Sequence, residues 1–495
     1  MINDGDNMLK IVSCLLQRLN TEVLYCHWKS NQHFNNALLG KDDLDILVDR
    51  KQKNTLIIIL SDLGFKHFYA PESKTYVGIE DYLGFDELTG KIVHLHLHYR
   101  LVMGEKHLKG FHLPIEDKVL KSRLWNHEHQ AYFSSTFYEL FFLIIRTAMK
   151  IRKRDVFHRQ VMNESSYLEF EWLSSNCTEF IKQLDEIDWM PKNIRILIER
   201  VYINQDYISY RKLQRLIYKE LNVYAQGTKF HNTLTRSSHE FKNKLLEIGK
   251  KYFPGNTFSR RRNASGGLLI SFIGADGAGK STIIKEIYRW LYDVMDVRHV
   301  YLGSGDGNSS LPRKILKATW ELLVKRRYRA DPDNDTNEKK EAIDISHTKW
   351  NFKNAVWTYL LSRERIQKIT RNSRYRIRGY VVLTDRYPQS EFYGLCDGKQ
   401  AHEGTKRFRW AARLEQDAFA KAKLVCPDIV IKLIVSSEVA KSRKGDDINI
   451  QINQAKTERV KALNFSEQTR SYEIDADAPL NNVLLVVKRI IWQAM

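Results

Sequence analysis

The pattern of hydrophobic positions along the chain is clearest around residue 270. Residues 268–273 form an almost continuous apolar run, which is typical of a buried strand, and apolar side chains then recur at helical spacing over 283–291. A glycine-rich segment at 274–282 separates the two. The pattern therefore predicts a strand, a tight loop and a helix in direct succession.

Strand and helix signals keep alternating after this point, which is the pattern of an α/β fold with a parallel sheet. The candidate strands are 268–273, His299–Leu302, Tyr380–Thr384, Ile429–Val435 and Tyr472–Ile474. Between the second and third strands lies an insert with two basic stretches, Arg313–Arg329 and Arg363–Arg378, around an acidic segment at 331–335 that we interpret as a loop.

The loop after the first of these strands carries a phosphate-binding motif. Residues 274–282 fit G-x-x-x-x-G-K-[ST], in which glycines let backbone amides converge on phosphate oxygens at a helix N-terminus. The ATP-binding residues are expected to be Gly274, Gly277, Gly279, Lys280, Ser281 and Thr282. Lys280 would reach the β- and γ-phosphates, and the Ser281 hydroxyl would bind Mg²⁺.

A second charged element follows the third candidate strand. Asp385 and Arg386 end a buried run, and in open α/β sheets ligands bind at the carboxyl ends of strands. Asp385 is expected to hold Mg²⁺ or its water, or to orient the acceptor, whereas Arg386 would bind an acceptor phosphate. The alternative is a structural ion pair at the strand end.

These motifs together resemble the thymidylate kinase family of P-loop nucleoside monophosphate kinases over most of 268–495. The resemblance rests on 272–282, 385–387, 427–433, the segment Glu364–Gln367, the stretch 436–445 and the turn 474–480. It implies a three-layer P-loop kinase domain that uses ATP and Mg²⁺ to phosphorylate a nucleotide-type acceptor.

The resemblance also implies roles for individual residues. Asp276 would contact the acceptor sugar hydroxyl, and Arg365 would hold the acceptor phosphate together with Arg386. Arg443 would close over ATP as a lid arginine, so the catalytic set is expected to be Lys280, Asp385, Arg386 and Arg443. The chain departs from the family after the second strand, where 300–307 lacks the family's Arg-Glu-Pro-Gly type segment, which puts dTMP itself in doubt as the acceptor.

The N-terminal region carries a different pattern. Asp43 and Asp45 are two residues apart on an expected strand, so their carboxylates share a face and could hold Mg²⁺. This segment resembles the D-x-D strand of the nucleotidyltransferase fold. The later strand has no carboxylate but has His94, His96 and His98, which either bind a metal or hydrogen-bond to neighbours.

The same patterns divide the chain into regions. We expect an α+β nucleotidyltransferase-like domain at 1–150, a helical middle region at 151–257, a basic flexible linker at 258–267 and the P-loop domain at 268–495. The helical region could be a spacer, a lid or a surface for homodimer formation.

Composition narrows the partners and the compartment. The net charge of +20 indicates anionic partners, and the five cysteines show no C-x-x-C pairing. The first residues lack a signal peptide, and the apolar runs are too short to span a bilayer, so we expect a cytoplasmic protein.

Two alternative functions stay open. One is phosphoryl or nucleotidyl transfer to a sugar or glycan in surface polysaccharide synthesis. The other is a nucleic-acid-linked NTPase in defence, which the chain's lack of a nucleic-acid-binding motif disfavours.

Overall fold

The computed structural model describes residues 8–105, 107–151, 161–252, 260–303, 313, 318, 352–392, 397–400, 408–445 and 448–495. These residues form two compact units, Met1–Ala264 and Ser265–Met495, which we call the N-terminal and C-terminal units. Three parts of the sequence analysis lie outside the described residues. They are Cys396, the acidic segment 331–335 that we interpret as a loop, and most of the basic stretch at 313–329.

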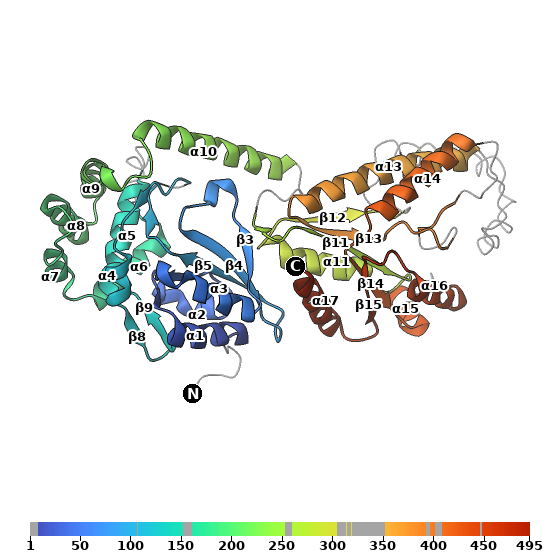
Figure 1. The fold of residues 1–495 in the computed structure, drawn as a ribbon, viewed down its shortest axis with the longest axis horizontal. Helices are drawn as coiled ribbons and strands as arrows, with labels where there is room; N and C mark the ends of the chain where they lie inside the picture. Colours follow the sequence, from blue (N-terminus) through green and yellow to red (C-terminus); the bar gives the residue numbers. More distant parts are fainter. Residues whose placement is uncertain are drawn as a thin grey trace. The chain divides into compact units, whose positions relative to one another are not determined.

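The C-terminal unit is built on a five-stranded parallel sheet (Figure 1). Its strands, in spatial order, are β12 (Val297–Tyr301), β13 (Val381–Asp385), β11 (Leu268–Gly274), β14 (Ile429–Ile434) and β15 (Arg470–Asp475). Its helices are α11 (Lys280–Tyr292), α13 (Phe352–Ile377), α14 (Arg409–Leu424), α15 (Ser437–Lys444), α16 (Ile450–Ala462) and α17 (Leu480–Ala494). The α/β class and all five predicted strands are confirmed, with β12 and β15 each starting two residues earlier than expected.

Alternation along the buried strands gives the C-terminal unit its layers. Leu269 packs with Ile369 of α13, and Ile273 packs with Val460 of α16. Residues of opposite parity, such as Phe272, point to the other face of the sheet, which α11 contacts. Both faces are therefore covered, as expected for a parallel sheet of β-branched and aliphatic residues.

The N-terminal unit contains a mixed eight-stranded sheet. In spatial order the strands are β10 (Arg262–Asn263), β3 (Lys66–Tyr69), β4 (Ile79–Phe85), β5 (Ile92–His98), β2 (Leu44–Val48), β1 (Tyr25–His27), β9 (Ala131–Phe133) and β8 (Leu124–Asn126). A separate hairpin joins β6 (Val102–Met103) and β7 (Phe111–His112). The helices are α1 (Lys10–Glu22), α2 (Phe34–Leu38), α3 (Lys53–Asp62), α4 (Glu116–Lys121), α5 (Thr136–Lys150), α6 (Glu164–Asn176), α7 (Phe180–Asp185), α8 (Lys192–Asn204), α9 (Tyr207–Glu220) and α10 (Lys229–Tyr252).

One apolar core crosses the region boundary that the sequence suggests at residue 150. Phe142 of α5 and Leu213 of α9 are fully buried in the same cluster, which also includes Cys26 of β1 in the sheet. Helices α6 to α9 therefore pack into the same unit as the sheet, because their apolar faces have α5 as a partner.

Within the predicted linker at 258–267, the structure shows a short strand. Arg262 and Asn263 form β10 and pair with Tyr69 and Phe68 of β3 in antiparallel register. The segment is polar and contains glycine, so its sequence does not predict a strand. The pairing of a two-residue edge strand depends on its partner strand and not on its own sequence.

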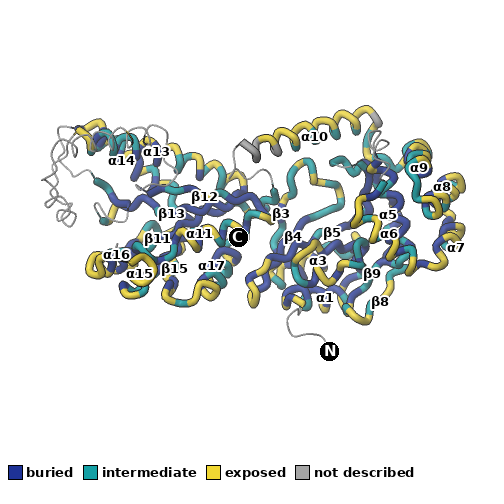
Figure 2. Tube along the Cα trace, turned by 180° about the vertical axis from the view of Figure 1, so that it is seen from behind, coloured by how far each residue is buried: buried dark blue, intermediate teal, exposed yellow. Residues whose placement is uncertain are grey.

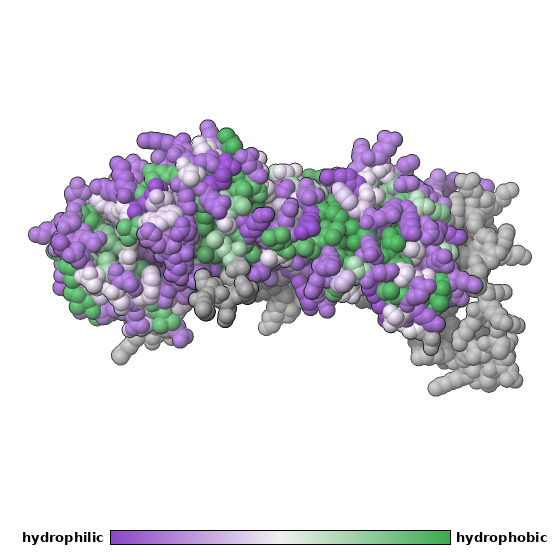
Figure 3. All heavy atoms as spheres, turned by 90° about the horizontal axis from the view of Figure 1, so that it is seen from below, coloured by the Kyte–Doolittle hydropathy of each residue, from purple (hydrophilic) through white to green (hydrophobic). Residues whose placement is uncertain are grey.

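The surface agrees with a strongly charged composition. Hydrophilic side chains cover most of the face drawn in Figure 3. Among the described residues, no helix has both the length and the apolar content that a membrane crossing requires.

Candidate functional site

The glycine-rich loop joins β11 directly to α11 in the C-terminal unit. Gly277 and Gly279 have φ angles of 83° and 79°, which favour glycine. A Cβ atom on Gly277 would also come within 2.9–3.0 Å of Ala440. The loop conformation thus depends on glycine at these positions, and it leaves the first turn of α11 open to an anion.

Lys280 is the first residue of α11, and its side chain folds back over the loop. Its Nζ donates hydrogen bonds to the carbonyl oxygens of Gly274 and Ala275, both at 2.9 Å. Burial, helped by the positive charge of Arg386, lowers the pKa of Lys280 to about 8. The ammonium group is therefore held at the position where a phosphate would bind, next to the exposed Ser281 and Thr282.

Asp385 lies across from the loop at the end of β13, in register with Phe272 of β11. Its carboxyl group is buried, and its Oδ1 accepts no hydrogen bond within the described part of the chain. Burial raises the pKa of Asp385, although Lys280 and Arg386 oppose that shift. A buried carboxylate oxygen without a donor, close to a phosphate loop, fits a Mg²⁺ ion or one of its waters.

Two of the predicted acceptor-binding arginines meet at one carboxylate that sequence reasoning missed. Asp397 accepts from the buried Arg365 at 3.2 Å and from Arg386 at 3.3 Å. Arg386 has a left-handed backbone (φ 67°), which is uncommon for a residue with a side chain, and its guanidinium lies 3.8 Å from Asp276. Asp397 follows no recognisable motif, so only the fold identifies it.

The C-terminal edge of the sheet contributes further cations. Arg443 of α15 donates to the carbonyl oxygens of Ala476 at 2.8 Å and Gly277 at 3.4 Å. Lys456 of α16, also missed from the sequence, donates to Asp276 at 2.7 Å. Burial alone would raise the pKa of Asp276, but the hydrogen bond and charge of Lys456, together with the charges of Lys280 and Arg386, lower it overall.

The structure thus brings every C-terminal residue of the predicted site to the carboxyl edge of one sheet. The cationic side chains at this edge outnumber the carboxylates that touch them, so the edge suits a polyanion. These cations are Lys280, Arg386, Arg443 and Lys456. Among the four arginines of the predicted basic stretch after Arg365, Arg376 is occupied elsewhere, because it pairs with Asp428 at 2.9 Å.

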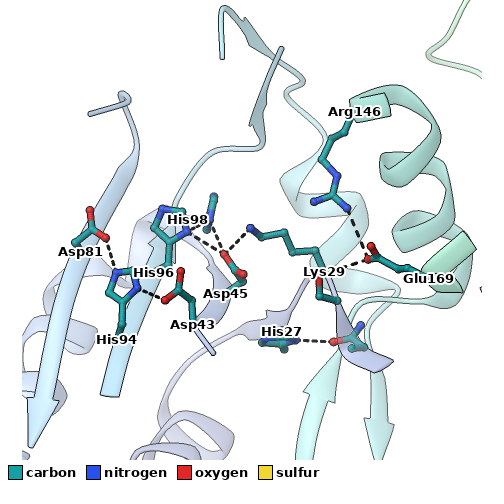
Figure 4. Close-up of polar contacts among 12 residues, drawn as sticks. His27, Lys29, Asp43, Asp45, Asp81, His94, His96, His98, Arg146 and Glu169 are labelled. Carbon is teal, nitrogen blue, oxygen red and sulfur yellow. Dashed lines mark hydrogen bonds and ion pairs between the residues drawn. The ribbon is translucent and has the colours of Figure 1, made fainter. Parts of the chain in front are cut away.

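A second polar cluster lies on the sheet of the N-terminal unit (Figure 4). Asp45 of β2 is in parallel register with His96 of β5, and Asp43 immediately precedes β2. Both aspartates point toward the histidines of β5, as their spacing predicts (Figure 4). β4 adds Asp81, which is in antiparallel register with His96.

His94 is the centre of one half of this cluster. Its Nδ1 lies 2.5 Å from Asp43, and its Nε2 contacts Asp81. Arg261 donates to Asp81 at 3.0 Å and lies 3.1 Å from His94. Burial lowers the basicity of His94, but its two carboxylate partners raise the net pKa. Asp81 therefore supplies the third carboxylate that the sequence of β5 lacks, from a neighbouring strand that the sequence did not single out.

Asp45 is the centre of the other half. Its Oδ1 lies 2.8 Å from Lys29 Nζ, 2.9 Å from His96 Nδ1 and 3.4 Å from His98 Nε2. Burial opposes ionisation of Asp45, but Lys29 and the two histidines hold its pKa well below the usual range. Burial lowers the pKa of His96 and, more strongly, that of His98, so both imidazoles are neutral at pH 7.

This grouping differs from the predicted Mg²⁺ site at Asp43 and Asp45. In the described residues, the set of donor atoms close enough to share one ion consists of Asp45, His96 and His98, whereas Asp43 is engaged with His94. The spacing predicted the shared face of both aspartates but not which groups they contact. Asp43 contacts His94 of β5, and Asp45 contacts His96 and His98 of β5 and Lys29, which follows β1.

Comparison with known proteins gives relatives for part of the chain. No family model matches it. The uncharacterized ATP-binding protein YghR of Escherichia coli K12 is 28% identical over 222 residues, which are 44% of this chain and 83% of YghR. The uncharacterized ATP-binding protein YghS of the same strain is 28% identical over 236 residues, 46% of this chain and 93% of YghS. The chain is therefore similar over just under half of its length to proteins whose names state ATP binding.

Proposed function

We propose that the C-terminal unit transfers the γ-phosphoryl group of ATP to a nucleotide-type acceptor, in the manner of thymidylate kinase-like enzymes. One observation carries the proposal. Lys280 lies over a phosphate loop, and on the adjacent strand Asp385 has a buried oxygen with no hydrogen-bond partner among the described residues. Phosphoryl transfer needs cations and positioning in place of a covalent nucleophile, and this site supplies both.

Each charged group has a role in that reaction. The loop amides and Lys280 hold the phosphates of ATP, and Ser281 and Asp385 hold Mg²⁺, which would neutralise charge on the β- and γ-phosphates. Arg443 already spans Gly277 and Ala476, so a small movement of its side chain brings it over the transferred group. In this proposal the additional cation near the transferred phosphoryl group is Arg443 of α15, which acts as a lid, and the phosphate loop does not supply it.

The acceptor binds on the other side of Asp276. Arg365 and Arg386 converge on Asp397, so an acceptor phosphate would compete with that carboxylate for two guanidinium groups. Lys456 holds Asp276 in place for a hydroxyl of the acceptor.

The similarity to YghR and YghS supports the ATP-binding part of the proposal. Both are named ATP-binding proteins, and the similar stretches of 222 and 236 residues are about as long as the C-terminal unit. We infer Mg-ATP as the ligand of this unit. Calorimetric titration of the folded protein with Mg-ATP tests this directly, and the absence of binding would refute the proposal.

The acceptor is identified by a panel experiment. The protein is incubated with γ-labelled ATP and nucleoside monophosphates, sugars or sugar phosphates, and the labelled product is separated. Labelling of a nucleoside monophosphate supports the proposal, whereas labelling of a sugar would support the polysaccharide alternative. ATP hydrolysis that requires DNA or RNA and weakens steeply with salt would support the nucleic-acid alternative.

A nucleotidyltransferase role of the N-terminal unit is a second candidate. The observation in its favour is that Asp43, Asp45 and Asp81 reach one face of the sheet from neighbouring segments. Transfer of label from α-labelled ATP or another nucleoside triphosphate to an acceptor, lost in Asp45→Asn, is the expected result; retention of that transfer in Asp45→Asn would exclude this site.

A further inference from the structure

The first inference concerns three donor atoms in the N-terminal unit. Asp45 Oδ1, His96 Nδ1 and His98 Nε2 are separated by 2.9, 3.2 and 3.4 Å. A triangle with these sides has a circumscribed radius of about 1.8 Å. An ion about 2.0–2.1 Å from all three atoms would therefore lie about 1 Å from their plane, which is the arrangement of three ligands around a tetrahedral or octahedral metal.

The chemistry of the donors selects the kind of ion. Imidazole nitrogens and a carboxylate oxygen are common metal ligands in proteins, and here the three donor atoms lie within 3.4 Å of one another. Two imidazole nitrogens and one carboxylate favour first-row transition metals over Mg²⁺, which prefers oxygen ligands. We propose that Asp45, His96 and His98 bind one divalent transition-metal ion of the zinc type.

Lys29 is the competitor of that ion. Its ammonium group lies 2.8 Å from the same carboxylate oxygen of Asp45. It must move away when a metal binds, because a protonated amine cannot be a ligand and would repel the ion. Lys29 therefore lowers the metal affinity of the site, and replacing it with an uncharged residue of similar length should raise that affinity.

His94 offers a control within the same cluster. It lies on the same strand and face as His96 and His98, but both of its nitrogens are engaged by Asp43 and Asp81. The guanidinium of Arg261 also lies 3.1 Å from its Nδ1 and provides a fixed positive charge there. The two halves of the cluster therefore differ in their capacity for a metal.

Titration of the chelator-treated full-length protein tests the proposal. Zn²⁺ is followed by calorimetry and Co²⁺ by its visible spectrum, with no nucleotide present. We expect one ion per chain, a loss of at least about tenfold in affinity in Asp45→Asn and His98→Asn, and a change below about threefold in His94→Gln. Lys29→Met should bind Zn²⁺ more tightly than the wild type, a gain that damaged folding cannot imitate.

Three results would overturn the metal site. They are a folded wild type that binds no Zn²⁺ or Co²⁺, an equal loss in His94→Gln and His98→Asn, and unchanged or weaker binding in Lys29→Met. Because these titrations contain no ATP, their outcome is independent of the proposed phosphoryl transfer.

The second inference concerns α10, whose amphipathic faces are reversed relative to an ordinary surface helix. Its polar residues contact the rest of the N-terminal unit: Arg236 pairs with Glu105, and His239 and Asn243 contact His107 at 2.9 and 3.2 Å. Its apolar side chains point away and are 52–80% exposed. They are Phe230, Leu234, Phe241, Leu245 and Ile248. Figure 2 shows most of the described length of α10 as exposed, with intermediate residues among the exposed ones.

These five residues form one narrow stripe. At 100° per residue their offsets of 4, 7, 4 and 3 positions keep them within an arc of about 60° over a length of about 27 Å. An exposed apolar stripe of this length, interrupted only near Ser237 and Ser238, costs free energy in water and marks a contact surface.

Charge indicates what covers the stripe. The segment 229–252 contains five lysines and one arginine against two glutamates, and the chain carries +20 overall. Two copies of this helix would repel each other, whereas an apolar stripe on a segment of net positive charge matches an anionic lipid surface. We infer that α10 lies on such a surface, with its apolar side chains inserted between the headgroups.

Vesicle sedimentation of the full-length protein tests this inference. We expect the protein to sediment with vesicles that contain about 30 mol % phosphatidylglycerol, less with phosphatidylcholine alone, and less as salt increases. The double substitution Phe241→Ser and Leu245→Ser should reduce the bound fraction at least about fivefold. Ile203→Ser is the matched control, because Ile203 is equally exposed but lies on α8.

Other outcomes would contradict the lipid surface. Vesicle binding that the double substitution does not change would show that α10 is not the contact. A dimer in light scattering that the double substitution dissociates, without vesicle binding, would show that a second copy of the chain covers the stripe.

Discussion

The two polar sites of this protein differ in how the chain builds them. The phosphate loop takes its glycines, its lysine and its hydroxyls from nine consecutive residues, 274–282. The N-terminal cluster takes Asp45, Asp81 and His96 from three strands that are neighbours only in the folded sheet. The first is rich in cations and suits a polyanion; the second combines carboxylates with imidazoles and suits a cation. Local sequence thus specifies the anion site, and strand register specifies the cation site.

The strongest test of the anion site is Lys280→Ala. Because the ammonium group is the cation nearest the loop carbonyls, we expect ATP turnover to fall by at least about 10⁴-fold. Turnover is measured as ADP release in a coupled assay. Lys285→Ala, on an exposed turn of the same helix, is the control and should behave like the wild type. Undiminished turnover in Lys280→Ala would remove the phosphate-loop assignment.

Asp385→Asn should have the next largest effect. The amide keeps the size of the side chain but loses the charge that Mg²⁺ requires, so we expect turnover to fall by about 10³-fold while ATP affinity changes little. Calorimetry and steady-state kinetics separate the two quantities. Weaker ATP binding with unchanged turnover would instead make Asp385 a structural partner of Arg386.

Arg443→Ala tests whether α15 acts as a lid. Loss of its guanidinium should lower kcat by about 10²-fold, because one cation near the transferred group disappears. Lys441→Ala, two residues earlier and exposed, controls for the general loss of positive charge on this helix. If both variants lose the same activity, α15 contributes only long-range attraction.

The pKa of Lys280 predicts a pH dependence of ATP binding. The free protein has this pKa at about 8, so the ammonium form decreases as pH rises through 8. The ATP dissociation constant should then increase by up to about tenfold per pH unit above 8. Lys280→Arg, which keeps its proton, should flatten the profile; a profile as steep as that of the wild type would assign the pH dependence to another group.

A buried acid in the N-terminal unit should give the smallest effect. Burial raises the pKa of Glu139 to about 7, although it accepts hydrogen bonds from Asn31 N and Nδ2 at 2.8 and 2.7 Å. Because the pKa of Glu139 is higher in the folded state than in the unfolded chain, its protonated carboxyl group stabilises the fold. This stabilisation is complete below about pH 4.5 and is lost as the pH rises through about 7. We expect the Tm of this unit to fall by about 2–4 °C between pH 6 and pH 8.

Glu139→Gln is the matching variant, because its side chain is neutral at every pH. Its Tm should be flat across the same range in differential scanning calorimetry. An equal fall in the variant would show that Glu139 is not the titrating group.

The sequence predicted the C-terminal unit well for a physical reason. A strand that is buried on both faces must be apolar throughout, so β11, β13 and β14 are legible as runs without knowledge of their neighbours. The catalytic motifs follow these strands directly, and their place at one sheet edge then follows from the parallel arrangement.

Other features depend on contacts that no local pattern records. Three residues outside the predicted site bind predicted residues across the chain. Asp397 is 32 positions from Arg365 and 11 from Arg386. Lys456 is 180 positions from Asp276, and Asp81 is 13 positions from His94. Asp397 in particular reaches the site only through Arg365 and Arg386. Register and loop placement decide such contacts, and a single sequence contains neither.

The two-residue strand β10 has a practical consequence for dissecting the protein. A truncation placed at residue 257, where composition suggests a linker, would remove β10 and leave the edge of β3 without a partner. An open strand edge invites aggregation. Cutting between Ala264 and Ser265 keeps β10 paired with β3 and leaves three residues before β11, so expression of either half should use that boundary.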